Sequence, residues 1–146
     1  MLINLLTGLP VILFCLVLQA LFITYCLRTY LRFRACSQAS PAVLPDILLL
    51  SAVMLLLMLG NCLQMALWAG LFMLLGEFDQ FVDALYFSGV TFATLGYGDL
   101  VLSERWRLLS ALEAANGILM FGVSTAVMTA AVGDVFKQNL LQHRQP

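Results

Sequence analysis

Charged side chains are scarce in this sequence. They make up 10% of the 146 residues, whereas hydrophobic side chains make up 62%. A soluble globular domain carries roughly a quarter charged residues and about half apolar ones. The scarcity of charge therefore excludes an ordinary soluble domain and indicates a protein whose solvent is the lipid bilayer.

Basic stretches, histidine clusters and paired cysteines are also missing. The net charge is −1 and no basic run is interleaved with aromatic residues, so we expect no nucleic-acid partner. The four cysteines have no CxxC spacing, and the single histidine, His143, lies near the end of the chain. No acid and base are paired on one helix face, so we expect no enzymatic activity and no cofactor.

Three long apolar runs are present instead. Residues 2–27 and 47–75 hold 26 and 29 residues without a charge, and residues 108–132 contain Glu113 as their one charge. Each run exceeds the roughly 20 residues that cross a bilayer core. We therefore predict an all-α membrane protein with three transmembrane helices. Pro10 is tolerated early in a helix or at a kink, so the first helix is expected to begin near it.

The segment between the second and third runs has a mixed character. Residues 76–106 are too polar to span the bilayer and too apolar for a solvated loop, so the segment is expected to re-enter the membrane. Asp79 is a favourable N-cap, which predicts a half-helix over residues 80–93, about 20 Å long. The half-helix is followed by "TLGYGD", residues 94–99.

Two glycines in this short stretch have a structural meaning. Successive backbone carbonyls can face one axis only if ordinary and left-handed dihedrals alternate, and glycine adopts the second kind at least cost. Gly96 and Gly98 supply this alternation, with Leu95 and Tyr97 turned away from the axis. One chain cannot surround an ion, whereas four identical chains around an axis can, so we predict a homotetramer.

The stretch "YFSGVTFATLGYGD", residues 86–99, resembles without a gap the pore helix and selectivity filter of the tetrameric potassium channels, the pore-loop family. The resemblance extends over about Ile47–Phe136, as in a small prokaryotic-type channel with one extra N-terminal transmembrane helix. It implies passive K⁺ conduction through a homotetramer, with K⁺ as the transported ion. It also implies that five residues form the ion-binding ladder and one lies at the outer mouth. In order, these are Thr94, Leu95, Gly96, Tyr97, Gly98 and, at the mouth, Asp99.

Some positions depart from the usual pattern of that family. Leu95 stands where valine is usual, which relaxes the backbone and could soften the selectivity. A nonselective cation channel and a non-conducting scaffold subunit are therefore the alternatives. Tyr86 and Phe87 stand in place of tryptophans, and Phe87 cannot donate a hydrogen bond to the hydroxyl of Tyr97. We expect support of the filter from Tyr86, Phe87, Thr91 and Glu113.

Glu113 is costly inside a membrane segment, by about 2.5 to 3.5 kcal/mol. It lies one turn before Gly117, where it could face the back of the half-helix and accept a hydrogen bond from Ser88 or Thr91. A protonated or snorkelling side chain is the alternative. Two polar residues of the second run, Asn61 and Gln64, are interpreted as interhelical contacts with the first helix.

The third run contains "NGILMFG", which resembles the inner helix of the same family. Gly117 would then be a hinge, although close helix packing explains a glycine equally well. The residues expected to line the cavity and gate are Gly117, Ile118, Phe121, Thr125 and Thr129.

These inferences predict the organisation of the whole chain. Five basic residues flank the predicted inner side against two on the other, so the N-terminus is expected outside and the C-terminus in the cytoplasm of a multi-pass plasma (cell inner) membrane protein. The extra helix is expected at the periphery of the tetramer. The predicted parts are the extra helix 1–34, a linker 35–46, a pore domain 47–136 (outer helix 47–75, pore helix 80–93, filter 94–99, inner helix 107–136) and a tail 137–146.

Overall fold

The computed structural model of the chain describes residues 1–36 and 43–142. These residues form four α-helices and no strand. The helices are α1 (Leu2–Cys36), α2 (Val43–Leu74), α3 (Phe81–Phe92) and α4 (Arg107–Gln142). Three segments are long and apolar enough to cross a membrane, namely Leu2–Arg32, Asp46–Leu74 and Arg107–Lys137. The predicted all-α architecture with three long apolar helices is confirmed.

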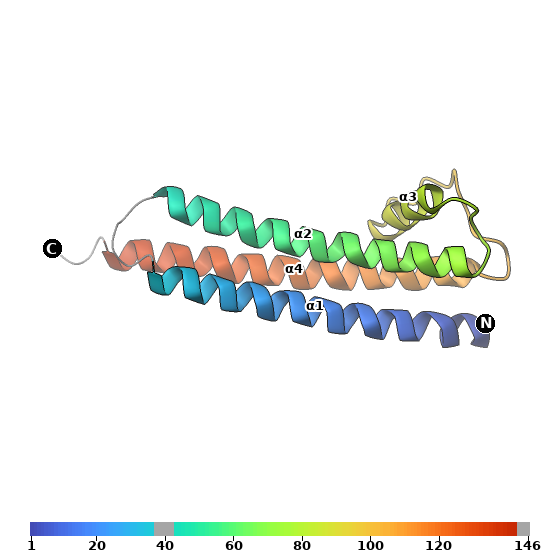
Figure 1. Cartoon of the computed structure of the whole chain (residues 1–146), viewed down its shortest axis with the longest axis horizontal. Helices are drawn as coiled ribbons and strands as arrows, with labels where there is room; N and C mark the ends of the chain where they lie inside the picture. Colours follow the sequence, from blue (N-terminus) through green and yellow to red (C-terminus); the bar gives the residue numbers. More distant parts are fainter. Residues whose placement is uncertain (37–42, 143–146) are drawn as a thin grey trace.

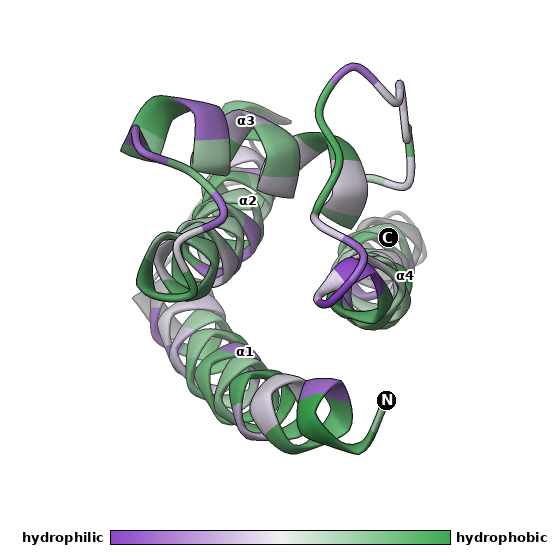
Figure 2. Cartoon of the chain, turned by 90° about the vertical axis from the view of Figure 1, so that its right-hand side faces the viewer, coloured by the Kyte–Doolittle hydropathy of each residue, from purple (hydrophilic) through white to green (hydrophobic). Residues whose placement is uncertain are grey.

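The three long helices lie side by side, and α3 lies at one end of them (Figure 1). The N-terminus is at the same end as α3, and the last turns of α4 are at the opposite end. In the view from the α3 end, the helices are largely hydrophobic and the hydrophilic residues gather in the connections (Figure 2). The short α3 and the loop that follows it therefore both lie at one end of the bundle.

The ends of the long helices differ from the prediction. α1 begins at Leu2 and continues through Pro10, so the expected start near Pro10 is wrong. Proline removes one backbone hydrogen bond, but in lipid the remaining bonds of the helix have no alternative partner. α1 and α2 both extend into the predicted linker 35–46, of which residues 37–42 lie outside the described residues. α4 also continues to Gln142, past the predicted end at 136, and His143 lies outside the described residues.

The start of α3 is one residue later than predicted. Asp79 is not the N-cap; this position is taken by Gln80, with φ −119° and ψ 133°, and its side chain makes no capping hydrogen bond. The backbone amide of Ala84 bonds the carbonyl of Gln80 at 3.2 Å, which closes the first turn. Hydrogen bonding within the turn thus starts this helix without a side-chain cap.

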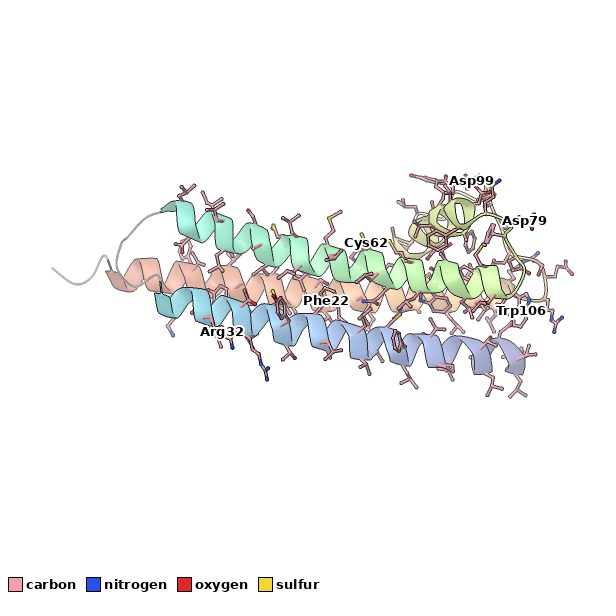
Figure 3. All side chains as sticks on the ribbon, in the orientation of Figure 1. Phe22, Arg32, Cys62, Asp79, Asp99 and Trp106 are labelled. Carbon is pink, nitrogen blue, oxygen red and sulfur yellow. The ribbon has the colours of Figure 1, made fainter. Side chains whose placement is uncertain are left out.

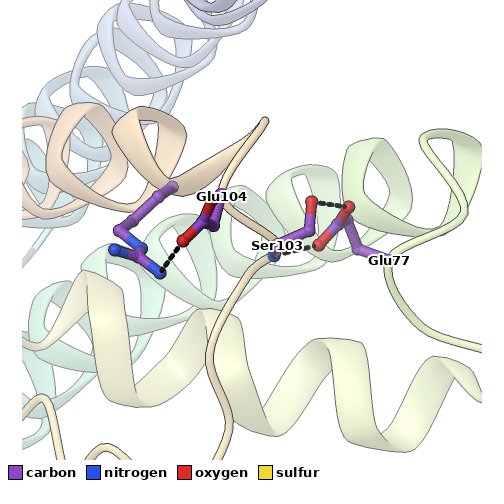
Figure 4. Close-up of polar contacts among 4 residues, drawn as sticks. Glu77, Ser103 and Glu104 are labelled. Atoms are coloured by element: carbon purple, nitrogen blue, oxygen red, sulfur yellow. Dashed lines mark hydrogen bonds and ion pairs between the residues drawn. The ribbon is translucent and has the colours of Figure 1, made fainter.

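The chain reverses direction after α2 at Gly76. This residue has φ +74°. Its backbone amide donates to the carbonyl of Met73 at 3.0 Å, and the backbone amide of Glu77 donates to the carbonyl of Phe72 at 3.0 Å. This is the Schellman arrangement, in which a left-handed glycine ends a helix. The carboxylate of Glu77 then accepts hydrogen bonds from the backbone amide and the hydroxyl of Ser103, both at 2.7 Å (Figure 4). The connection before α3 is therefore tied to the connection before α4.

The main apolar core lies at the α3 end of the bundle. Phe87 packs its ring against that of Phe72, with the ring centroids 5.3 Å apart and nearly perpendicular. Phe72 in turn lies 5.9 Å from Trp68. All four helices and the loop before α4 contribute to this core, whose buried members are Cys15, Trp68, Phe72, Phe87, Phe92, Leu102, Trp106, Leu109 and Met120. A smaller cluster lies nearer the opposite end and joins α1, α2 and α4.

Candidate functional site

The glycine loop, residues 94–99, follows directly after α3. It contains three positive φ values at alternating positions: Thr94 at 59°, Gly96 at 57° and Gly98 at 79°. The alternation expected from the two glycines is confirmed, and it extends one step further to Thr94. A β-branched residue in the left-handed region costs about 1 to 3 kcal/mol, so its surroundings must hold it there. Sequence reasoning missed this position because glycine was its only signal for the left-handed region.

The beginning of the glycine loop is fixed by backbone hydrogen bonds to the last turn of α3. The amide of Thr94 bonds the carbonyl of Thr91 at 2.9 Å. The amides of Leu95 and Gly96 both bond the carbonyl of Val90, at 2.9 and 3.4 Å. These bonds satisfy carbonyls that a helix end otherwise leaves without a partner. The loop therefore leaves α3 with a defined direction.

The end of the glycine loop is fixed by a side chain of α3. The hydroxyl of Tyr86 donates a hydrogen bond of 2.7 Å to the carboxylate of Asp99. This bond lowers the pKa of Asp99 below its usual value of 3.8, and it raises the pKa of Tyr86 above 10.0. Asp99 lies at the end of the molecule where α3 lies (Figure 3). Tyr86 thus supports the loop through Asp99.

Phe87 and Thr91 lie on the buried side of α3. The ring of Phe87 is 5.3 Å from that of Phe78 as well as from that of Phe72, so this residue fixes α3 onto α2 and the connection after it. Thr91 lines a hollow of about 200 Å³ together with Gly96 and Gly98. The hollow lies between α3, the glycine loop and the start of α4. Phe87 supports α3 itself, while Thr91 lies next to the loop.

Glu113 of α4 is completely buried and faces α3. Its Oε1 is hydrogen-bonded to the hydroxyl of Ser88 on α3. The same hydroxyl lies 2.8 Å from the carbonyl oxygen of Met65 on α2. The expected contact between Glu113 and Ser88 is therefore confirmed, and the snorkelling alternative is wrong because the side chain does not reach the surface. This chain of contacts joins α4, α3 and α2 behind the glycine loop.

Gly117 lies where α4 meets the end of α3. A Cβ atom on Gly117 would lie 1.9 Å from the carbonyl oxygen of Phe92 and 2.8 Å from its carbonyl carbon. Backbone atoms cannot move aside as the end of a flexible side chain can. The close-packing interpretation of Gly117 is thus confirmed, whereas its role as a hinge stays a prediction.

The other residues predicted for the cavity lie along α4 beyond Gly117. Ile118 and Phe121 are exposed in the single chain, and the ring of Phe121 packs edge-on to Phe92 at 5.7 Å. The hydroxyls of Thr125 and Thr129 bond carbonyls of their own helix, at 2.8 and 2.9 Å. Phe121, Thr125 and Thr129 follow at intervals of four residues, so they share one face of α4. That they line a cavity stays a prediction.

The geometry can now be compared with known proteins. The sequence model described as "Ion channel" matches residues 47–134, which comprise α2 from Ile47, α3, the glycine loop and α4 to Asp134. The chain belongs to the ion channel family. Together with its three apolar helices, this makes it a multi-pass membrane protein. Comparisons with curated proteins and with solved structures gave no match. α1 lies outside the matched residues.

Proposed function

We propose that the chain forms a potassium-selective channel in which four copies place their glycine loops around one axis. The observation that carries this proposal is the alternation of left-handed φ at Thr94, Gly96 and Gly98. Such alternation suits a ladder of carbonyl oxygens that face one side, which can replace the water around a dehydrated monovalent cation. Thr94, Leu95, Gly96 and Tyr97 present the ion-coordinating oxygens, and Gly98 ends the ladder.

Two further features favour a cation on this path. The C-terminal end of α3 carries a partial negative charge, because its last carbonyls are aligned along the helix. The carboxylate of Asp99 adds a negative charge at the opposite end of the loop, and its lowered pKa keeps it ionised at neutral pH. Conduction is passive, since the ion exchanges water for fixed oxygens and moves down its gradient.

The tetramer is supported by what a single chain leaves exposed. Tyr97 is 67% exposed and Leu95 is 57% exposed, although both belong to the segment that would lie at membrane depth. Irregular backbone is tolerated there only where protein or a water-filled passage surrounds it. Neighbouring copies would cover these side chains and the hollow beside Thr91. Five basic residues lie on the side of the predicted membrane away from the glycine loop, against two on its own side. This excess supports an outward-facing glycine loop and a cytoplasmic C-terminus in the plasma membrane.

Leu95 supports one alternative, a nonselective cation channel of the same fold. A γ-branched side chain restricts the backbone less than valine does, so the oxygens could adapt to Na⁺. A non-conducting scaffold subunit is the second alternative. Ion flux separates the scaffold from both channels, and the relative permeability of K⁺ and Na⁺ separates the two channels.

The test is K⁺ flux into liposomes that contain the purified protein, with a mass measurement of the assembly. Gly98→Ala places a side chain at φ +79°, at a cost of about 1 to 2 kcal/mol. Gly76→Ala is the matched control, because Gly76 has φ +74° and its Cβ would also meet nothing within 4 Å. We expect flux in the wild-type protein and in Gly76→Ala but none in Gly98→Ala, and a fourfold assembly. Equal flux in the two variants would contradict the proposed role of the loop.

A further inference from the structure

α1 lies outside the segment that matches the ion channel family, yet polar side chains join it to α4 and the segment before it at three depths. Near the α3 end, the amide of Asn4 donates to the carbonyl of Arg105 at 3.0 Å. At mid-length, the amide of Gln19 donates to the hydroxyl of Ser124 at 3.1 Å. Towards the opposite end, the hydroxyl of Tyr30 donates to the carboxylate of Asp134 at 2.7 Å. These bonds are more specific than contact between apolar surfaces.

The contact at mid-length involves three helices. Gln64 of α2 donates from its amide nitrogen to the amide oxygen of Gln19 at 2.8 Å, and Gln19 donates onward to Ser124. Gln19 and Gln64 are both buried. Lipid tails are as apolar as the side chains of a membrane helix, so apolar contact alone favours no particular position of one helix against another. Polar contacts between helices therefore help to fix their relative position. Gln19 therefore fixes the position of Ser124 on α4 relative to α2.

α1 is also packed closely onto α2 at this level. A Cβ atom on Gly60 of α2 would lie 3.3 Å from the ring of Phe22 and 3.4 Å from the amide oxygen of Gln19. Phe22 lies about half-way along α1 (Figure 3). Because a glycine permits this approach and Gln64 bonds Gln19, α1 and α2 form one frame against which α4 lies.

The two ends of α4 are held in different ways. Before Gly117, α4 is fixed to α3 by the contact of Glu113 with Ser88 and by the close approach at Phe92. Beyond Phe121, the C-terminal part of α4 (residues 122–137) packs on α1 and α2 through the smaller apolar cluster. Among the described side chains, Ser124 and Asp134 of this part accept hydrogen bonds from Gln19 and Tyr30 of α1. A movement of the C-terminal part alone would break both bonds.

We propose that Gln19 and Tyr30 are positioning residues through which α1 sets the balance between the conducting and closed conformations of the pore. This rests on the proposed function, because the C-terminal part of α4 would surround the passage below the glycine loop. Bonds made in one conformation and broken in the other shift the populations toward the first. Since both bonds hold the same part of α4, loss of either must shift the balance in the same direction.

The experiment is single-channel recording in a planar bilayer with Ser124→Ala and Tyr30→Phe. Ser124→Ala removes the acceptor of the Gln19 bond, and Tyr30→Phe removes the donor of the bond to Asp134. Both variants leave Gln19 paired with Gln64. We expect each variant to change the ratio of open to closed time about threefold, in the same direction, with single-channel conductance and reversal potential unchanged. Ser124→Thr keeps a hydroxyl and should restore the wild-type ratio. Unchanged conductance distinguishes an effect on gating from general damage to the pore.

Two control variants come from α1 itself. The hydroxyl of Thr24 bonds the carbonyl of Ala20 in its own helix at 2.8 Å, so Thr24→Val should leave the ratio unchanged. Asn4→Ala removes a bond to Arg105 at the α3 end, before Gly117, and should also leave it unchanged.

Each remaining outcome overturns a stated part of the proposal. A wild-type chain without current would overturn the proposed function and this inference with it. Wild-type current with an unchanged ratio in Ser124→Ala and Tyr30→Phe, or shifts in opposite directions, would overturn the inference alone. An equal shift in Asn4→Ala would also overturn it, because α1 would then act by packing along its whole length.

Discussion

At the residue scale, the hydrogen bond from Tyr86 to Asp99 is the clearest electrostatic feature of the glycine loop. It lowers the pKa of Asp99 from 3.8 and raises that of Tyr86 from 10.0. A lowered carboxyl pKa gives stability that is present above pH 3.8 and lost as the pH falls through the lower, folded value. A raised phenol pKa gives stability that is present below pH 10.0 and lost above it. The pair is therefore intact from about pH 4 to 10.

Tyr86→Phe removes this donor with little change in shape. We expect the pKa of Asp99 to rise toward 3.8, because the hydrogen bond is the main cause of its lowering. The pKa can be followed by NMR of the labelled aspartate carboxyl carbons during an acid titration. Tyr25→Phe, at an exposed position on α1, is the control and should leave the titration of Asp99 unchanged.

Glu113 provides a second prediction at this scale. Glu113→Leu fills a similar volume but makes no hydrogen bond, which leaves the Ser88 hydroxyl with Met65 as its described partner. We expect this variant to loosen α3 and to lower both the thermal stability of the assembly and its K⁺ flux. Glu113→Gln keeps a polar group that can bond Ser88, so its loss should be smaller. Equal stability and flux in Glu113→Leu and the wild type would rule out a supporting role for Glu113.

The residue scale also shows how far sequence reasoning extends. The left-handed conformations of Gly96 and Gly98 were predictable, because only glycine adopts them cheaply. A contact of Glu113 with α3 was predictable because a buried carboxyl group needs a partner, whereas the choice of Ser88 over Thr91 was not. The conformation of Thr94 was not predictable from its side chain, since its own preference opposes it. Backbone bonds to the last turn of α3 hold it instead.

At the element scale, the crossing of α4 with the end of α3 determines where the glycine loop begins. Gly117 allows this crossing, because a Cβ atom there would meet the carbonyl oxygen of Phe92 at 1.9 Å. The existence of the three long helices followed from their apolar length alone. The ends of these helices could not be predicted in the same way. α1 and α2 extend into a segment whose composition, rich in serine and proline, favours a linker. The N-cap of α3 was also misplaced by one residue, since backbone bonds closed its first turn.

Gly117→Ala tests this crossing directly. The added methyl group must push α4 away from α3, so we expect a loss of thermal stability of about 1 to 3 kcal/mol and a loss of K⁺ flux. Gly122→Ala is the control, because a Cβ atom on Gly122 would meet nothing within 4 Å in the chain. The measurement is thermal unfolding together with liposome flux. A Gly117→Ala protein as stable and active as Gly122→Ala would contradict the role given to the crossing.

At the scale of the whole molecule, side-chain hydrogen bonds join α1 to α2 and α4 of the matched segment. The expected contact of Gln64 with the first helix is confirmed by its bond to Gln19. The partner of Gln19 on α4 could not be predicted, because an isolated polar residue in an apolar run does not reveal which helix it faces. The tetramer and the peripheral place of α1 within it stay predictions, since they depend on contacts between chains.

The central claim is that assembled glycine loops pass K⁺ in preference to Na⁺. Its most direct measurement is the reversal potential of the current through the purified protein in a planar bilayer, with K⁺ on one side and Na⁺ on the other. We predict a reversal potential displaced far from zero in the direction that K⁺ permeation requires. A reversal potential near zero, or no current from a correctly assembled protein, would contradict the claim.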